Sequence, residues 1–312
     1  MTPSLPLLGQ PGGLLFFTLL FTLGLQLLVG TPLLALAAGK MAGGQTRETP
    51  ARWLIRAALP AICLGMTAGL PLLFSLGSRF TPLYRQSPLS FTELGTAAVG
   101  LGALTVALLF LFYLVSGKKP AAGAGLLTLL GALALLAAVQ LLAIAPHLTA
   151  MTPAALAGHW LALPLFVHLL AGSPVITGLL AMLAAAYQKD YRRRLPREFY
   201  LQAFRFGGRW TLYATLAQLL TGAWVVFSLP PAARAGLLAG SRLVMLAVGL
   251  GCLVLGLLLL LKILHDNLAN SRAATIVAML LLAATLLTFI GGSRPPLPTA
   301  APAAGPPTME TR

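Results

Sequence analysis

His168 is the residue of this sequence whose position most needs a chemical explanation, because it lies inside an apolar run long enough to cross a bilayer. The run extends from Trp160 to Tyr187, and His168 lies about 12 Å along a helix from Trp160. Ionisable side chains are costly at that depth and by default indicate a functional site. The alternative interpretation is a neutral imidazole that hydrogen-bonds to a neighbouring helix.

A soft metal ligand and a cation lie near the start of a later apolar run. Met245 lies about 8 Å along the helix from Gly240, and Arg242 is about one turn closer to the helix start. A His and a Met that face each other across a helix bundle are an axial ligand pair for low-spin haem, and an arginine can bind a haem propionate. Met and Arg near helix ends are also common packing and snorkelling residues, so both interpretations remain open.

Composition determines the kind of scaffold that must position these side chains. Hydrophobic residues make up 58% of the chain and charged residues 9%, and the mean hydropathy is +0.89. We therefore expect an all-α, multi-pass transmembrane bundle of about eight helices within residues 1–292. The expected spans are 13–38, 53–77, 95–116, 123–146, 160–187, 208–228, 240–264 and 273–291. The Pro/Ala-rich tail, 293–312, has the composition of a disordered segment.

The distribution of positive charge predicts the orientation in the membrane. The net charge of +15 comes from basic residues in short loops, which argues for topology signals and against nucleic-acid binding. With eight spans, 15 of the 21 Lys and Arg residues fall on one side and 6 on the other. This asymmetry predicts an inner (cytoplasmic) membrane protein with both termini outside the cytoplasm. Lys40 is the first basic residue, so we expect no cleavable signal peptide.

The longest polar segment, 188–209, carries seven basic residues with aromatic residues between them. It is either a contact for anionic lipid or a partner protein, or a loop that fixes topology, and we favour the loop. Cys63 and Cys252 lie in separate apolar runs, and the sequence lacks the Cys-x-x-Cys-His motif that attaches c-type haem. His265 follows the seventh run and is expected at the interface with water.

The order of these motifs resembles subunit I of the cytochrome bd quinol oxidases and their shorter bd-like relatives that accompany c-type cytochromes. FVHLLAGSPVITGLLAMLAAAY resembles the helix whose histidine ligates the low-spin b haem, a role that the resemblance gives to His168. SRLVMLAVGLG is similar to the family's Arg-x-Met followed by Gly-Leu-Gly, with Arg-x-x-Met here, and implies Met245 as second ligand. PLSFTE resembles the start of the family's third helix, where Glu93 matches an acidic residue of the high-spin haem site.

Three departures from that family limit the activity that the resemblance implies. Phe21 stands where the family has the histidine ligand of the high-spin haem, and Leu101 stands where it has a second acidic residue. The segment PPAARAGLLAG is far shorter than the family's quinol-oxidising loop. The resemblance therefore implies at most one low-spin haem b, and we do not expect this chain to reduce oxygen by itself.

We expect an electron-transfer subunit that relays electrons between a quinol and an outer-face c-type cytochrome, within a membrane complex of several subunits. If the chain is part of an enzyme, that enzyme is a quinol-linked oxidoreductase complex. Two alternatives remain: a haem-free membrane anchor or assembly subunit, and a transporter. The polar side chains available to line a transport path within the spans are Gln26, Gln140 and Gln218.

Overall fold

The computed structural model describes residues 11–38, 49–84, 91–116, 121–148, 153–191, 194–229, 231–266 and 270–293. Within these ranges the chain forms helices and connecting turns, with no strands, which confirms the predicted all-α class. The expected disordered tail after Ser293 lies outside the described residues. The helices are α1 (Pro11–Ala38), α2 (Pro50–Tyr84), α3 (Phe91–Val115), α4 (Ala121–Leu148), α5 (Pro153–Tyr191), α6 (Arg197–Ser228), α7 (Pro231–Leu237), α8 (Gly240–His265) and α9 (Ser271–Ser293).

Eight of these helices correspond to the eight expected spans, and most extend several residues beyond them. α5 and α6 gain the most, because α5 begins at Pro153 and ends at Tyr191 and α6 begins at Arg197. The segment 188–209, which we expected to be a loop, is therefore helical over 188–191 and 197–209. The short helix α7 was not expected. It begins at Pro231, where a proline suits the first helical position because its missing N–H needs no partner there. The chain then enters α8 through Gly240, whose φ of +56° favours glycine.

The molecule is a multi-pass membrane protein by the length and apolar character of its helices. Among the described residues, seven helices are long and apolar enough to span a bilayer, and α9 contains a shorter apolar stretch, Ser271–Leu287. Many large hydrophobic side chains are exposed on the surface of the bundle. Examples are Leu220, which is 76% exposed, and Phe227, which is 73% exposed. In water such a surface would be costly, so it fits a lipid environment.

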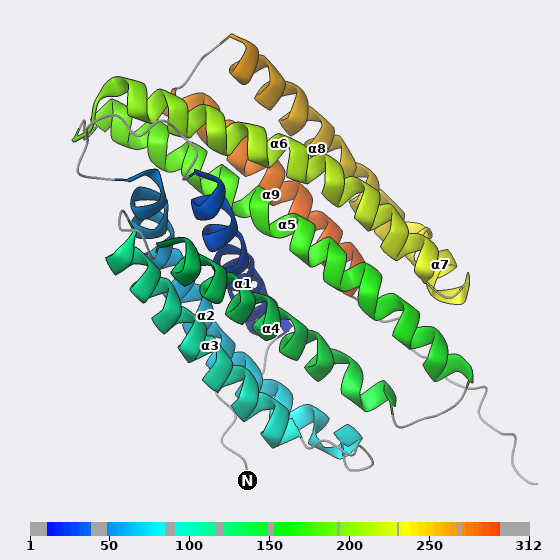
Figure 1. The fold of residues 1–312 in the computed structure, drawn as a ribbon. Coiled ribbons are helices and arrows are strands. Elements are labelled where there is room, and N and C mark those ends of the chain that lie inside the picture. Colours follow the sequence, from blue (N-terminus) through cyan, green and yellow to red (C-terminus); the bar gives the residue numbers. More distant parts are fainter. Residues whose placement is uncertain are drawn as a thin grey trace, which may run out of the picture.

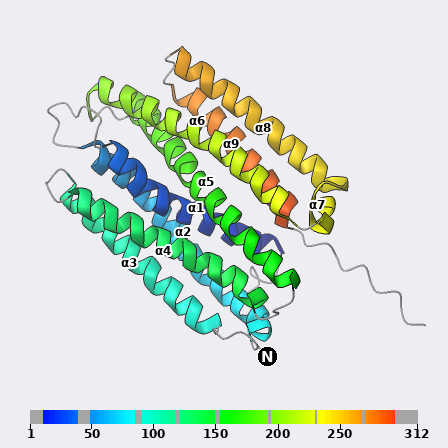
Figure 2. The same ribbon diagram turned by 45° about the vertical axis from the view of Figure 1, so that its right-hand side comes forward.

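The bundle has two halves that meet at α5. Figure 1 and Figure 2 show α1 to α4 on one side of α5 and α6, α8 and α9 on the other. Glycines permit the closest helix contacts, as expected where backbones approach in a membrane. A Cβ on Gly178 of α5 would lie 2.7 Å from the Gly207 carbonyl oxygen of α6. A Cβ on Gly30 of α1 would collide with the Ser173 carbonyl oxygen of α5.

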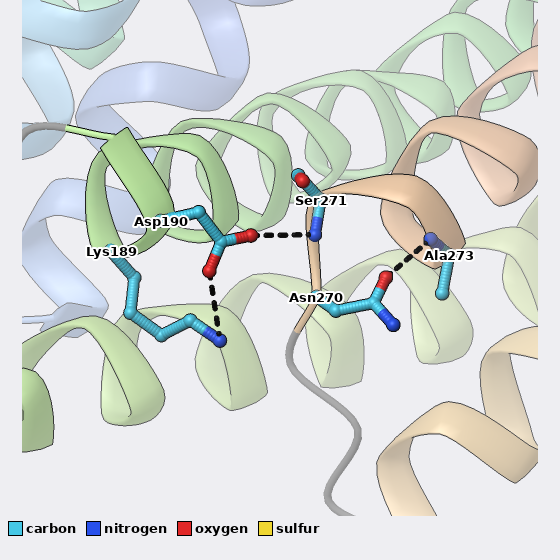
Figure 3. Close-up of polar contacts among 5 residues, drawn as sticks. All are labelled: Lys189, Asp190, Asn270, Ser271 and Ala273. Carbon is cyan, nitrogen blue, oxygen red and sulfur yellow. Dashed lines mark hydrogen bonds and ion pairs between the residues drawn. The ribbon is translucent and has the colours of Figure 1, made fainter.

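Polar contacts join the helices at the end where α5 finishes and α9 begins. The Trp53 Nε1–H of α2 donates to Gln188 Oε1 of α5 at 2.9 Å. Figure 3 shows the Asp190 carboxylate, which accepts from the Ser271 N–H at 3.1 Å and lies 3.3 Å from Lys189 Nζ. Asp190 thus supplies an acceptor to the free N–H groups at the start of α9, and fixes that helix against α5.

Candidate functional site

His168 lies on α5 and its half-buried imidazole faces α6. Its Nδ1 lies 3.1 Å from Thr221 Oγ1. The Thr221 hydroxyl lies 3.2 Å from the Gln218 carbonyl oxygen of its own helix and can donate its single proton there. The contact with Nδ1 forms with either neutral tautomer of the imidazole, and it holds the ring against α6. In the tautomer that carries its proton on Nδ1, the Nε2 atom keeps its lone pair.

Glycine on the facing helix makes room for this ring. A Cβ on Gly222 would lie 3.2 Å from the Cε1 atom of His168, closer than most side-chain contacts. Gly222 follows Thr221 directly, so one short stretch of α6 supplies both the hydrogen-bond partner and the space for the imidazole. Pro164 and Pro174 lie in α5 on either side of His168, and each removes one backbone hydrogen bond from the helix.

Two glutamine side chains converge on Gly172, which lies one turn after His168 on α5. The amide nitrogens of Gln26 on α1 and Gln218 on α6 each lie 2.8 Å from the position that a Cβ on Gly172 would occupy. Gln26 is only 7% exposed, and Gln218 is half-buried. Together with His168 and Thr221, these residues form what we call the central polar cluster, which joins α1, α5 and α6.

Threonine hydroxyl groups lie where α1, α5 and α6 pack together, between the central polar cluster and the Asp190 end of α5. Most of them donate to a carbonyl of their own helix, as Thr215 does to the Thr211 oxygen at 2.6 Å. Within the part of the chain that the structure describes, the buried Oγ1 atoms of Thr31 on α1 and Thr177 on α5 have no hydrogen-bond partner. Thr177 lies against Gly30, so the two hydroxyls are found near the same α1–α5 crossing.

Met245 lies on α8, which packs against α9 and α6. In both ribbon views α6 and α9 lie between α5 and α8 (Figures 1 and 2). Gly208 of α6 is level with Leu264 of α8, since a Cβ there would meet the Leu264 side chain at 2.8 Å. Continuing that antiparallel register places Thr221 level with Gly251, about 9 Å along α8 from Met245. The structure thus turns His168 toward α6 and does not pair it directly with Met245.

Arg242 is half-buried near the start of α8, and its Nη1 lies 3.8 Å from the position of a Cβ on Gly236 of α7. The structure places it beside the α7 turn. His265 is exposed at the end of α8. The side chains of His147 and His159 lie outside the described residues. Among the residues whose side chains are described, no group of three or more His, Cys, Asp or Glu could hold a metal ion.

Two of the residues that departed from the bd pattern have packing roles. The Phe21 ring of α1 fills the space over Gly69 of α2, where a Cβ would lie 2.7 Å from the ring. Leu101 of α3 packs at the edge of the apolar core. Glu93 lies in the first turn of α3, a favourable place for a carboxylate near the helix N-terminus.

Sequence reasoning missed Thr221, Gly222 and Gly172. A signal was present, because Gln218, Thr221 and Gly222 follow the three- and four-residue spacing of one helix face. Gly172 is also one turn after His168 on α5. Which helix that face would meet depends on tertiary packing, and the sequence pattern alone does not give it.

Comparisons of the chain with protein-family models, curated proteins and solved structures found no match. Function is therefore inferred from the chemistry of the central polar cluster.

Proposed function

We propose that this chain is a bd-like integral membrane electron-transfer subunit that holds one low-spin haem b through His168. It would relay electrons between a quinol and an outer-face c-type cytochrome, in a complex with other subunits. The supporting observation is the half-buried imidazole that is held against α6 by a contact of 3.1 Å between its Nδ1 and Thr221 Oγ1. In the tautomer that donates from Nδ1, the Nε2 lone pair is left to bind a metal. Histidines that ligate metals commonly donate the other ring N–H to an oxygen, which fixes their tautomer and orientation.

The protein side chains have separable roles in this proposal. His168 supplies the Nε2 ligand, and Thr221 together with the Gln218 carbonyl holds the ring against α6. A b haem, when bound, supplies a one-electron redox centre whose potential depends on its axial ligands and surroundings. Arg242 is proposed to bind a propionate. Met245 was expected as the second ligand, but α6 and α9 lie between its helix, α8, and α5, so the proposal rests on His168 alone.

The proposed orientation follows from charge. The helix ends at Asp190 and Ser271 belong to the side rich in Lys and Arg, so we propose that this side faces the cytoplasm and that His168 lies in the outer half of an inner membrane. An outer location is suited to exchange of electrons with a c-type cytochrome. The oxidoreductase activity would belong to the complex, and this chain would not reduce oxygen by itself.

A second candidate function rests on the polar contacts themselves. Gln26 and Gln218 meet beside His168 within the apolar core, an arrangement that could also line a transport path. In that case the imidazole would bind or release the transported species instead of a metal. A haem-free anchor or assembly subunit is the remaining alternative, and in it the cluster would only hold α1, α5 and α6 together.

Spectroscopy of the purified full chain separates these functions. We expect a b-type alpha band in the reduced-minus-oxidised spectrum and one haem per chain by pyridine haemochrome. His168→Ala should lose the haem, whereas the matched control His265→Ala, whose side chain is exposed at the end of α8, should retain it. Full b haem in His168→Ala would refute the assignment. If the wild-type protein binds no haem, the transporter and the haem-free anchor or assembly subunit are the functions that remain.

A further inference from the structure

The outward face of α6 carries a continuous exposed row of side chains whose character changes along the helix. We call this row the α6 stripe; its members are Arg205, Arg209, Tyr213, Leu216, Leu220, Trp224 and Phe227. They recur every three or four residues, so they share one face of the helix. The opposite face is buried against the bundle and includes Ala203, Gly207, Thr211 and Ala214.

The order of side chains in the α6 stripe gives their depth in the bilayer. Arg209 and Phe227 are about 27 Å apart along the helix, close to the hydrocarbon thickness of about 30 Å. Leu216 and Leu220 lie between them, and Trp224 with Phe227 forms the aromatic band typical of the opposite interface. Arg205 and Arg209 therefore lie at the level of the lipid headgroups, at the end rich in basic residues.

The two arginines have no carboxylate to balance them within the described structure. The ion pair at this end joins Lys189 to Asp190, and neither Arg205 nor Arg209 takes part in one. Both are exposed and are four residues apart, where like charges on one helix face repel. The sequence has 21 Lys and Arg residues and only 6 Asp and Glu, so an external anion is the available counter-charge.

We propose that Arg205 and Arg209 bind the phosphate of an anionic phospholipid, whose acyl chains lie along Tyr213, Leu216 and Leu220. Guanidinium groups bind phosphate oxygens in a fixed two-pronged geometry, and two of them one turn apart suit a single phosphate. The aliphatic continuation of the stripe distinguishes a lipid from free phosphate or an acidic protein segment, because only the lipid covers both parts. This inference is independent of the haem proposal.

Lipid binding can be measured on the purified full chain in detergent by native mass spectrometry. The titrants are phosphatidylglycerol, phosphatidylcholine with the same acyl chains, and inorganic phosphate. We expect phosphatidylglycerol to bind at least about tenfold more tightly than phosphatidylcholine, and the preference to disappear in Arg205→Gln/Arg209→Gln. Arg272→Gln is the matched control, because Arg272 is exposed at the same end on α9.

Three results would overturn the proposal: an unchanged lipid preference in the double variant, an equal loss in Arg272→Gln, or competition by inorganic phosphate at the same concentration as lipid. Arg205→Lys/Arg209→Lys provides a second readout. It keeps both charges but loses the planar fork, so the preference should fall without vanishing. Circular dichroism checks that the helix content of each variant is unchanged, and the midpoint of its thermal unfolding checks the packing; neither should change, since both side chains are exposed.

Discussion

Thr221→Val tests the hydrogen bond on which the His168 geometry depends. Valine keeps a similar shape but has no hydroxyl to hydrogen-bond with the imidazole Nδ1, which lies 3.1 Å from Thr221 Oγ1. Hydrogen bonds between membrane helices contribute about 0.6 kcal/mol on average and about 1.7 kcal/mol at most. The Gln218 carbonyl remains as another acceptor near the same ring, so the loss should be moderate. We expect unfolding free energy to fall by about 1 kcal/mol.

A double-mutant cycle isolates this contact from other effects of the substitutions. His168→Ala, Thr221→Val and the double variant are unfolded reversibly in a detergent–denaturant titration followed by circular dichroism. A coupling energy of about 0.6 to 1.7 kcal/mol is expected. Thr96→Val is the control, since the exposed Thr96 hydroxyl donates within α3 to the Thr92 oxygen at 2.8 Å. A coupling energy near zero would refute the assigned contact.

The same variant gives a functional readout if haem is bound. Loss of a group that orients a metal ligand usually lowers metal affinity or activity by about 10- to 100-fold. Thr221→Val should therefore weaken haem retention by about that factor, whereas Thr96→Val should leave it unchanged. The measurement is the haem-to-protein ratio during titration with a haem-binding competitor. Unchanged retention in Thr221→Val would mean that the hydroxyl does not orient the ligand.

Three further predictions concern packing, capping and topology. Gly65→Ala should destabilise the bundle by about 1 to 3 kcal/mol, because the added Cβ would meet the α1 backbone, whereas Gly100→Ala, with no atom within 4 Å, should be neutral or stabilising; the same unfolding titration measures both. Asp190→Ala removes the acceptor for the Ser271 N–H and should cost about 0.5 to 2 kcal/mol, visible also as faster hydrogen exchange at the start of α9. A reporter fused after Arg312 that is active only outside the cytoplasm should be active, and activity of a cytoplasmic reporter there would reverse the proposed orientation.

The sequence by itself determined the class of fold and most of the helices. Apolar runs of bilayer length can bury their backbone polar groups only by forming helices, so composition and run length sufficed. The sequence did not predict the short helix α7, because its seven residues are too few to show a periodic apolar pattern. The sequence did not predict the helical ends at 188–191 and 197–207, because their polar residues resemble a loop when the neighbouring helices are unknown.

The sequence also identified His168 as a candidate site residue. The free-energy cost of an ionisable side chain within an apolar run depends on the run itself, which the sequence shows directly. Tertiary structure alone decided what surrounds it. Thr221 and Gln26 come from helices far away in sequence, and they reach the imidazole and Gly172 because small residues let α1, α5 and α6 approach closely. Distances from the helix starts were consistent with similar depths for Met245 and His168, but in the bundle α6 and α9 lie between α8 and α5. Lateral neighbours depend on which faces pack together, and that is a property of the whole bundle.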